Sequence, residues 1–317
     1  MRLHFAQPHV ARRGDLMELQ WPLIIFTACM AWSAGLLASQ SIAAFAGRGS
    51  KAQVPALATS FAILVVGGVA VFFHLHHWER IFNGFGHITS GITQELIAIV
   101  LMVLVMLVFF IQVRRSGAVS RAVAVAGVVV SVVLCIAVAH SYMLASRPVW
   151  DSVLWPLCML GNACVLGPAT YAFISGACAR DGEGEEDAES PKLRLGMTML
   201  VGAGINAVCT LAYLVSMACS SGRFFDVGYS FDPVLPNKAL PDVSSLVAVF
   251  TGSEAVITWV GVILVGLLAP LACAALARAG KVSYRVAGAA AVLAAFVGAL
   301  CLRVVFYDLG TTMFLLF

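Results

Sequence analysis

The sequence predicts an all-α integral membrane protein, an eight-transmembrane-helix bundle in a single domain over residues 1–317. Of the 317 residues, 61% are hydrophobic and only 11% are charged, whereas a soluble domain carries about 25% charged residues. The chain contains eight apolar runs of the length that crosses a bilayer, about 20 residues each. None of them alternates as the strands of a membrane barrel do, so helices must satisfy the backbone in lipid.

The first four apolar runs predict spans near 21–46, 53–77, 92–113 and 119–143. Polar residues separate them, with Gly47–Lys51 after the first run and Arg114–Gly117 after the third. The first run also has features of a signal peptide, because basic residues precede it and "AFA" at Ala44–Ala46 is similar to a cleavage site. However, the apolar run from Trp21 is longer than a typical signal core of about 7–15 residues. We therefore expect it to form the first helix.

The last four apolar runs predict spans near 152–178, 194–219, 252–277 and 284–306. The acidic segment "ARDGEGEEDAESPKLR" separates the fifth run from the sixth and is expected to form a loop. Segment 220–251 separates the sixth from the seventh and is rich in aromatic residues and Pro. A connection of that length usually has a function of its own or is disordered.

The basic residues predict the orientation of the bundle. Side A denotes the membrane face that carries the N-terminus, and side B the opposite face. With eight spans, 11 of the 19 Lys and Arg fall on side B, which predicts that side B is cytoplasmic and that both termini are extracytoplasmic in the cell membrane. The three Arg of the N-terminal tail favour the opposite orientation. The side-B residues are Arg48, Lys51, Arg114, Arg115, Arg121, Arg180, Lys192, Arg194, Arg278, Lys281 and Arg285.

The cysteine pattern and the net charge argue against several kinds of site. The nine Cys lie singly within apolar runs and form no C-x-x-C pair, so the sequence contains no iron–sulfur or zinc ligand motif. Cys in such positions is expected to act as a small buried hydrophobe. The net charge of +3 is small and scattered, which argues against nucleic acid as a partner.

The stretch "FFHLHHWERIFNGFGHITSGITQEL", residues 72–96, gathers ionisable residues at the side-A end of the second and third spans. His74 lies near the end of one span and Glu95 near the start of the next. An antiparallel helix pair would bring these two side chains toward one pocket. A quinol site needs a hydrogen-bond acceptor and a group that takes up protons, for which His and a carboxylate are suited.

Other roles for this stretch remain open. A metal ion could use His74, His76 and His77, but their spacing does not place all three on one helix face. A haem needs an axial His inside the bundle, and only His140 would offer one from another span. Most of these side chains, His87 among them, could equally lie at the wet interface without a binding role.

Four blocks of the sequence resemble a known family. "ELQWPLIIFT" is similar to a family opening of the form EWPLxIFT, and "HLHHWERIFNGFGHITSGITQE" to a segment of the form H-L…R-x-F-N…S…E. "SVLWPLCMLGNACVLGPATY" keeps two family prolines, Pro156 and Pro168, and "RVVFY" is similar to RxVFY. In this order the blocks resemble the membrane-anchor subunit of bacterial dimethyl sulfoxide reductase, of the DmsC type. The "HHWE" turn and segment 220–251 depart from the family pattern.

The resemblance implies an eight-span anchor subunit that oxidises menaquinol to menaquinone during anaerobic respiration. Family members pass the electrons to an iron–sulfur subunit, which feeds a molybdopterin catalytic subunit. The three subunits form a heterotrimer that reduces dimethyl sulfoxide or a similar acceptor. The family's anchor carries no haem or iron–sulfur cluster, and no metal site is expected in this chain.

The resemblance also assigns roles to individual residues. The family's quinol-site His falls on His74, and its essential Glu falls on Glu95, which would accept or relay a proton. Arg80 and Asn83 match the pattern between them and are expected to contribute to quinol binding. Arg303 and Tyr307 of the last block are expected to support the site from the same side of the bundle or to contact a partner subunit.

Two other classes of function are compatible with an eight-span bundle. A transporter would place ionisable residues near mid-membrane and break its helices in paired halves, whereas the middles of the third and fourth spans are almost purely aliphatic. Pro156, Pro168 and Pro270 are the features that favour it. A purely structural anchor would hold a soluble enzyme on the bilayer and would need no polar pocket.

Overall fold

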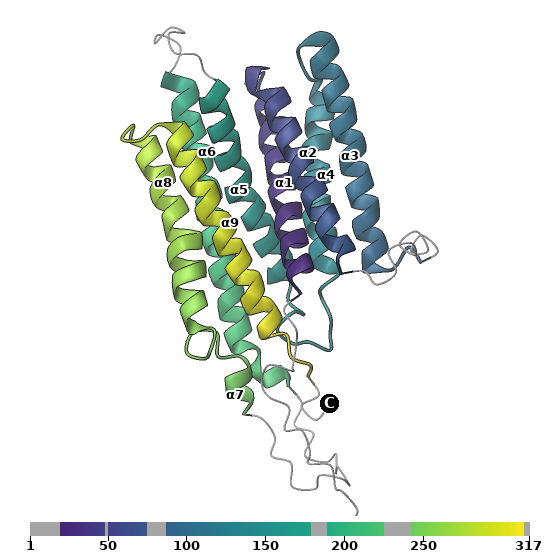
Figure 1. Ribbon diagram of the computed structural model, residues 1–317, viewed down its shortest axis with the longest axis vertical. Helices are drawn as coiled ribbons and strands as arrows, with labels where there is room; N and C mark the ends of the chain where they lie inside the picture. Colours follow the sequence, from purple (N-terminus) through teal and green to yellow (C-terminus); the bar gives the residue numbers. More distant parts are fainter. Residues whose placement is uncertain (1–19, 48–49, 75–86, 179–188, 225–241, 314–317) are drawn as a thin grey trace, which may run out of the picture.

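The protein is a bundle of long helices that run side by side (Figure 1). The computed structural model describes residues 20–47, 50–74, 87–178, 189–224 and 242–313. Eight helices in these ranges are long and apolar enough to cross a membrane, and no strand occurs among the described residues. The predicted all-α, eight-helix fold is confirmed.

The spans begin and end within a few residues of the predicted positions, with two larger differences. α2 ends at Phe72 rather than near residue 77, so His74 lies in the turn that follows it. α6 begins at Glu189, inside the segment expected to be a loop. The long helices are α1 (Trp21–Phe45), α2 (Ser50–Phe72), α3 (Gly91–Ser116), α4 (Arg121–His140), α5 (Leu154–Cys178), α6 (Glu189–Ala218), the π-helix η4 (Ile257–Leu268), which continues as α8 (Ala269–Arg278), and α9 (Tyr284–Asp308); the short ones are η3 (Cys219–Arg223) and α7 (Val243–Leu246).

The helix ends on side B carry clear sequence signals. Ser120 and Ser283 cap α4 and α9, because each side chain accepts a hydrogen bond from the backbone N–H three residues later. Gly117 follows α3 with φ of 70°, a left-handed conformation that glycine adopts at little cost. Short turns therefore join α3 to α4 and α8 to α9, which makes these pairs antiparallel.

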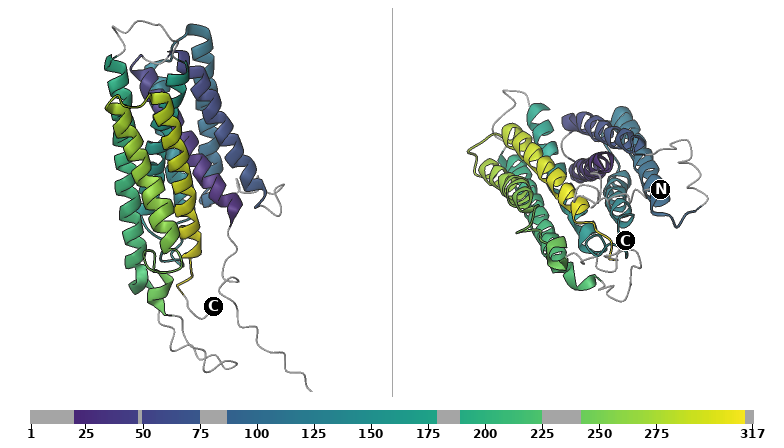
Figure 2. Two further views of the ribbon diagram at one scale, coloured as in Figure 1. Left: turned by 60° about the vertical axis from the view of Figure 1, so that its left-hand side comes forward. Right: turned by 60° about the horizontal axis from the view of Figure 1, so that its bottom comes forward.

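α1 and α5 form the centre of the bundle, and the other helices surround them (Figure 2). Their most apolar 18-residue windows are 67% and 72% buried, compared with 22% for α3. α1 packs against α2, α4 and α5, and α5 also packs against α6 and α9. A Cβ at Gly35 would overlap the backbone of Ala163, and one at Gly167 would overlap the backbone of Gly35. Small residues thus let the α1 and α5 backbones touch, as is typical of membrane helices.

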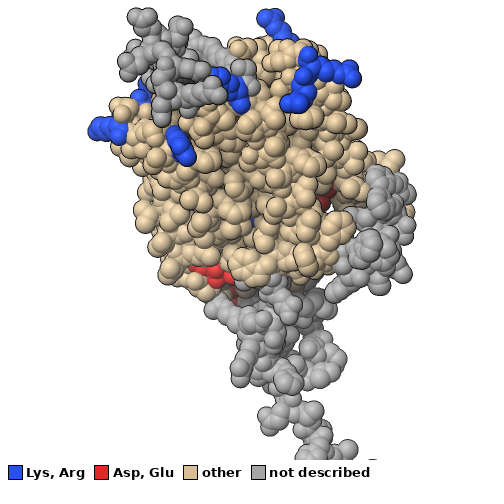
Figure 3. All heavy atoms as spheres, turned by 45° about the horizontal axis from the view of Figure 1, so that its top comes forward, with Lys and Arg blue, Asp and Glu red and all other residues tan. Residues whose placement is uncertain are grey.

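Basic side chains gather at the end of the bundle that holds the α3–α4 and α8–α9 turns, shown at the top of Figure 3. The described residues there are Lys51, Arg114, Arg115, Arg121, Arg278, Lys281 and Arg285. This is side B, and the positive-inside rule assigns such an end to the cytoplasm. The orientation in the membrane stays a prediction.

Cysteine labelling in intact cells tests that orientation. Cys219, at the start of η3 on side A, is exposed. We expect an impermeant maleimide to label it in intact cells and to stop doing so in Cys219→Ser. In that background Ala118→Cys, in the exposed α3–α4 turn, should be labelled only after permeabilisation. The opposite pattern would reverse the topology.

Candidate functional site

Glu95 is a buried carboxylate between α3 and α4 at the side-A end of the bundle. Its side chain is 9% exposed, and the Ser141 hydroxyl, just beyond the end of α4, donates a hydrogen bond to Glu95 Oε1. The two helix ends approach closely because Gly91 has no side chain, and a Cβ there would lie 2.9 Å from Ser141 Cα. The α3–α4 pair therefore holds one carboxylate in a largely apolar setting.

Two tyrosines lie beside this carboxylate within an aromatic cluster. The rings of Tyr142 and Tyr307 are nearly perpendicular, with centroids 6.3 Å apart. Trp150 packs edge-on to both of them and stacks on Phe306 at 4.7 Å, and Phe306 stacks on Trp155 at 4.2 Å. Residues from the α4–α5 connection, α5 and α9 therefore form one continuous apolar wall around the two phenols.

The phenol of Tyr142 is held in its neutral form. Burial raises its pKa well above 10, and the nearby Tyr307 and the negative charge of Glu95 raise it further. Tyr307 is 3% exposed, and its hydroxyl makes no hydrogen bond of normal geometry with any described residue, although the Tyr142 phenol is close enough to interact with it. The site thus offers a carboxylate and two phenol O–H groups at one place.

Arg303 lies inside the bundle with no exposed surface. It stands five residues before the end of α9, about 7.5 Å inside at 1.5 Å per residue. Its Nε donates to Thr27 Oγ1 at 2.7 Å, and Nη2 donates to Thr27 O at 3.2 Å and Met159 Sδ at 2.9 Å. Its Nη1 donates to Asn162 Oδ1 and Ala299 O, both at 2.9 Å. Its hydrogen bonds lie within the bundle, and both expected roles for Arg303, support of the site and contact with a partner subunit, stay predictions.

The polar network around Arg303 continues from α5 into α6. Asn162 Nδ2 donates to Asn206 Oδ1 at 2.9 Å, and the Thr210 hydroxyl donates to the same oxygen at 3.4 Å. All of these side chains are buried. The network links four helices. Tyr307 follows Arg303 by one turn on α9 and is close enough to both Arg303 and Glu95 to interact electrostatically with each.

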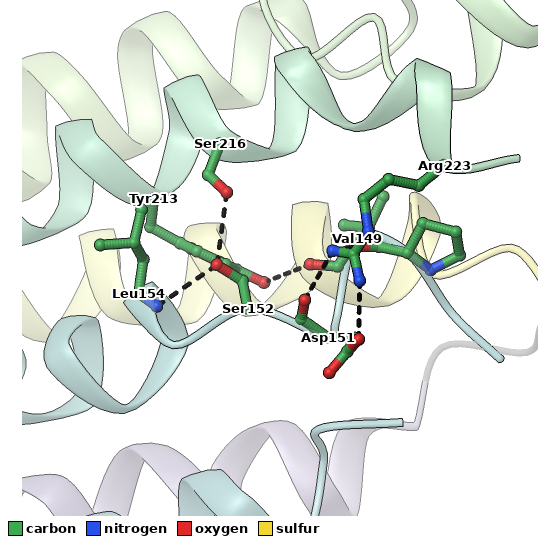
Figure 4. A network of polar contacts seen from close by, with 8 residues as sticks. Val149, Asp151, Ser152, Leu154, Tyr213, Ser216 and Arg223 are labelled. Atoms are coloured by element: carbon green, nitrogen blue, oxygen red, sulfur yellow. Dashed lines mark hydrogen bonds and ion pairs between the residues drawn. The ribbon is translucent and has the colours of Figure 1, made fainter. Parts of the chain in front are cut away.

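The connection between α4 and α5 folds back across the side-A end of the bundle (Figure 4). Tyr213 Oη donates to Val149 O at 3.0 Å, and Arg223 pairs with Asp151 at 2.6 Å. This ion pair is partly exposed and stabilises little by itself. Together these contacts hold Trp150, whose indole N–H donates to Phe306 O at 2.7 Å, over the aromatic cluster. Tyr307 is buried beneath this connection, whereas Tyr142 is partly exposed.

Of the three residues predicted to bind quinol, the structure describes only His74. His74 is half-buried in the turn after α2, and its side chain makes no hydrogen bond with a described residue. Arg80 and Asn83 lie outside the described residues. Among the described side chains, the hydrogen-bond partner of Glu95 is Ser141 and not a His. A pocket shared by His74 and Glu95 therefore stays a prediction.

Sequence reasoning missed several members of this site. Ser141 and Tyr142 fall within the span predicted at 119–143 but were not singled out. Asn162 and Asn206 are isolated polar residues in apolar runs, and polar side chains at such positions commonly mark function. That signal could have found them, although it would not have shown that they meet Arg303.

Comparisons with known proteins do not assign this chain to a family. No protein-family model matches the chain, and no curated protein matches it. Among the described residues, no group of three or more His, Cys, Asp or Glu is arranged to hold a metal ion.

Proposed function

We propose that this chain is the membrane anchor of a molybdopterin oxidoreductase complex and that it oxidises menaquinol on side A. The electrons would pass to an iron–sulfur subunit and then to a molybdopterin catalytic subunit that reduces dimethyl sulfoxide or a similar acceptor. One observation carries the proposal. A buried carboxylate, Glu95, lies at the side-A end of the bundle beside two tyrosines, Tyr142 and Tyr307.

The residues present are suited to a quinol headgroup. A quinol has two ring hydroxyls, and the site offers Glu95 as an acceptor and Tyr307 as a phenol with no hydrogen bond of normal geometry to a described residue. The Tyr307 hydroxyl, which lies close to the Tyr142 phenol, can donate a hydrogen bond to a ring oxygen. Trp150 and Phe306, which stack on each other, make the surroundings of the two phenols apolar, as suits a quinol ring.

The work of the chain itself is then binding and proton handling. Bound menaquinol supplies two electrons, which the partner's cluster accepts, and two protons. Glu95 accepts the protons of the two ring hydroxyls one after the other and releases each to side A, while the Ser141 hydroxyl holds the carboxylate in position. His74 accepts a hydrogen bond from the second hydroxyl, and Arg80 and Asn83 are the further residues expected to contribute to binding. The redox cofactors belong to the partner subunits.

Replacing His74 tests the binding role. In the purified complex we expect His74→Ala to weaken binding of a fluorescent quinol analogue about tenfold, which is the value of one hydrogen bond to a polar ligand. His87→Ala is the matched control, because His87 is exposed on the same side. Unchanged affinity in His74→Ala, with both variants fully assembled, would remove His74 from the site.

A second candidate function is transport. It is favoured by the buried polar network of Arg303, Asn162 and Asn206, because ionisable residues within the membrane often line substrate pathways. Pro168 lies inside α5, and η4 is a π-helix rather than an α-helix. Irregular helices of this kind are common in transporters. Solute uptake into proteoliposomes that contain the chain alone would favour transport. A quinone retained by the purified protein would favour the quinol site and exclude a purely structural anchor.

A further inference from the structure

The turn that joins α3 to α4 on side B carries three exposed arginines. Arg114 and Arg115 lie in the last turn of α3, and Arg121 is the first residue of α4. None of them forms an ion pair with a residue that the structure describes. The Arg121 guanidinium lies 5.8 Å from the centre of the Phe45 ring at the end of α1, and this ring is neutral. The turn therefore presents three uncompensated positive charges to its surroundings.

Neutral side chains, rather than these arginines, hold the turn in shape. The backbone N–H of Ser120 donates to Gln112 Oε1 at 2.8 Å, and the Ser120 hydroxyl caps α4. Gly117 supplies the left-handed residue after α3. The guanidinium groups are thus free to bind a ligand, and replacing them should remove charge without altering the turn.

The arginines lie at the end of rows of side chains that face lipid. On α4, Arg121 is followed at intervals of four residues by Val125 and Val129, which are 50% and 54% exposed, and residues four apart share a helix face. On α3, Arg115 follows the exposed Ile111 at the same interval. α3 is also the least buried of the eight spans. The guanidinium groups therefore lie where the apolar surface ends, at the depth of the lipid headgroups.

The second basic turn on side B, between α8 and α9, has different neighbours. Arg278 packs against α6, because a Cβ at Gly196 would lie 3.1 Å from its Cα. Arg285 packs against α5 at Gly176. The ends of α5 and α6 are joined by residues 179–188, which contain five Asp and Glu. The α3–α4 turn contains none, so it is the stronger candidate for binding an anion.

We propose that the α3–α4 turn binds the headgroup of an anionic phospholipid in the side-B leaflet. A guanidinium can hold two phosphate oxygens through parallel hydrogen bonds, and basic residues at the cytoplasmic end of membrane helices commonly bind anionic lipids. The apolar rows of α3 and α4 contact the acyl chains of the same molecule, a contact that free phosphate cannot make. This surface lies at the opposite end of the bundle from the quinol site and does not depend on it.

Thermal unfolding of the full chain in mild detergent, with any subunits that co-purify, tests this surface. Phosphatidylglycerol is titrated in one arm and phosphatidylcholine with the same acyl chains in the other. We expect saturable stabilisation by phosphatidylglycerol alone, and we expect high salt to weaken it by screening the charges. Inorganic phosphate should not stabilise the protein. If it does so as well as phosphatidylglycerol, the turn binds free phosphate and the lipid proposal is wrong.

A triple variant assigns the effect to the turn. Arg114→Gln, Arg115→Gln and Arg121→Gln together should raise the phosphatidylglycerol concentration for half-maximal stabilisation at least about tenfold. The same variant should unfold at the wild-type temperature in phosphatidylcholine, because its arginines do not hold the turn.

The other basic turn provides the matched control. Arg278→Gln, Lys281→Gln and Arg285→Gln together remove the same charge from the same side, and this variant should keep the wild-type response to phosphatidylglycerol. Equal losses in the two triple variants would show a general attraction of side B for anionic lipid and would overturn the proposal. A wild-type protein that phosphatidylglycerol does not stabilise would overturn it as well.

Discussion

Glu95→Gln is expected to lower quinol-dependent reduction of the terminal acceptor by about 100-fold in the assembled complex, the usual contribution of a positioned proton acceptor. Gln keeps the size of the side chain and one carbonyl oxygen that can accept the Ser141 hydrogen bond. It cannot take up a proton at neutral pH. The loss should therefore appear in turnover rather than in folding, and steady-state assays with a reduced menaquinol analogue would measure it.

An artificial electron donor provides the control for this variant. A donor that reduces the partner's clusters directly bypasses the quinol site, so Glu95→Gln should retain wild-type activity with it. Loss of both activities would indicate damaged assembly. If the fully assembled variant turns over quinol at the wild-type rate, Glu95 is only a carboxylate at the membrane interface, and the relay assignment is wrong.

Gly35→Ala is expected to destabilise the bundle by about 3 kcal/mol, near the upper end of the usual cost of overpacking. The added methyl would overlap the backbone of Ala163, and a helix backbone cannot move aside as a flexible side chain can. Of the eight spans, α1 and α5 have the largest buried shares of their apolar windows, so separating them loosens the whole bundle. The variant should have a lower unfolding temperature and a smaller yield of monodisperse protein in detergent.

Gly204→Ala is the matched control for this packing effect. A Cβ at Gly204 of α6 meets nothing within 4 Å, and replacing a helical Gly by Ala normally stabilises by about 0.5–1 kcal/mol. The two glycine variants should therefore change stability in opposite directions. Equal stability of Gly35→Ala and the wild type would contradict the close crossing of α1 and α5.

The apolar pattern was sufficient to predict the fold, because each span follows from its length and composition. The end of α2 was less predictable. In the sequence, apolar and aromatic residues continue past Phe72 into "FHLH", residues 73–76. In the structure, α2 ends at Phe72 and His74 lies in a turn. Composition alone contains no signal for that end, since no Gly or Pro follows it directly.

The site was only partly predictable, because it depends on which helices are neighbours. Glu95 could be singled out as a carboxylate at the end of an apolar run. Its contact with Ser141 follows from the short α3–α4 hairpin, but its proximity to Tyr307 requires the end of α9 to lie beside Tyr142, which follows α4. The burial of Arg303 depends in the same way on acceptors from α1 and α5. From its sequence Arg303 was expected to support the site or to contact a partner subunit, and no periodicity reveals that hydrogen-bond acceptors from α1, α5 and α9 surround it.

Direct binding of menaquinol tests the central claim of a side-A quinol site most directly. The measurement is fluorescence quenching of a menaquinol analogue titrated with the purified complex, compared between the wild type and Tyr307→Phe. We predict saturable quenching that menaquinone displaces, and affinity weakened about tenfold by the loss of the Tyr307 hydroxyl. The absence of saturable quenching by a fully assembled wild-type complex would contradict the account.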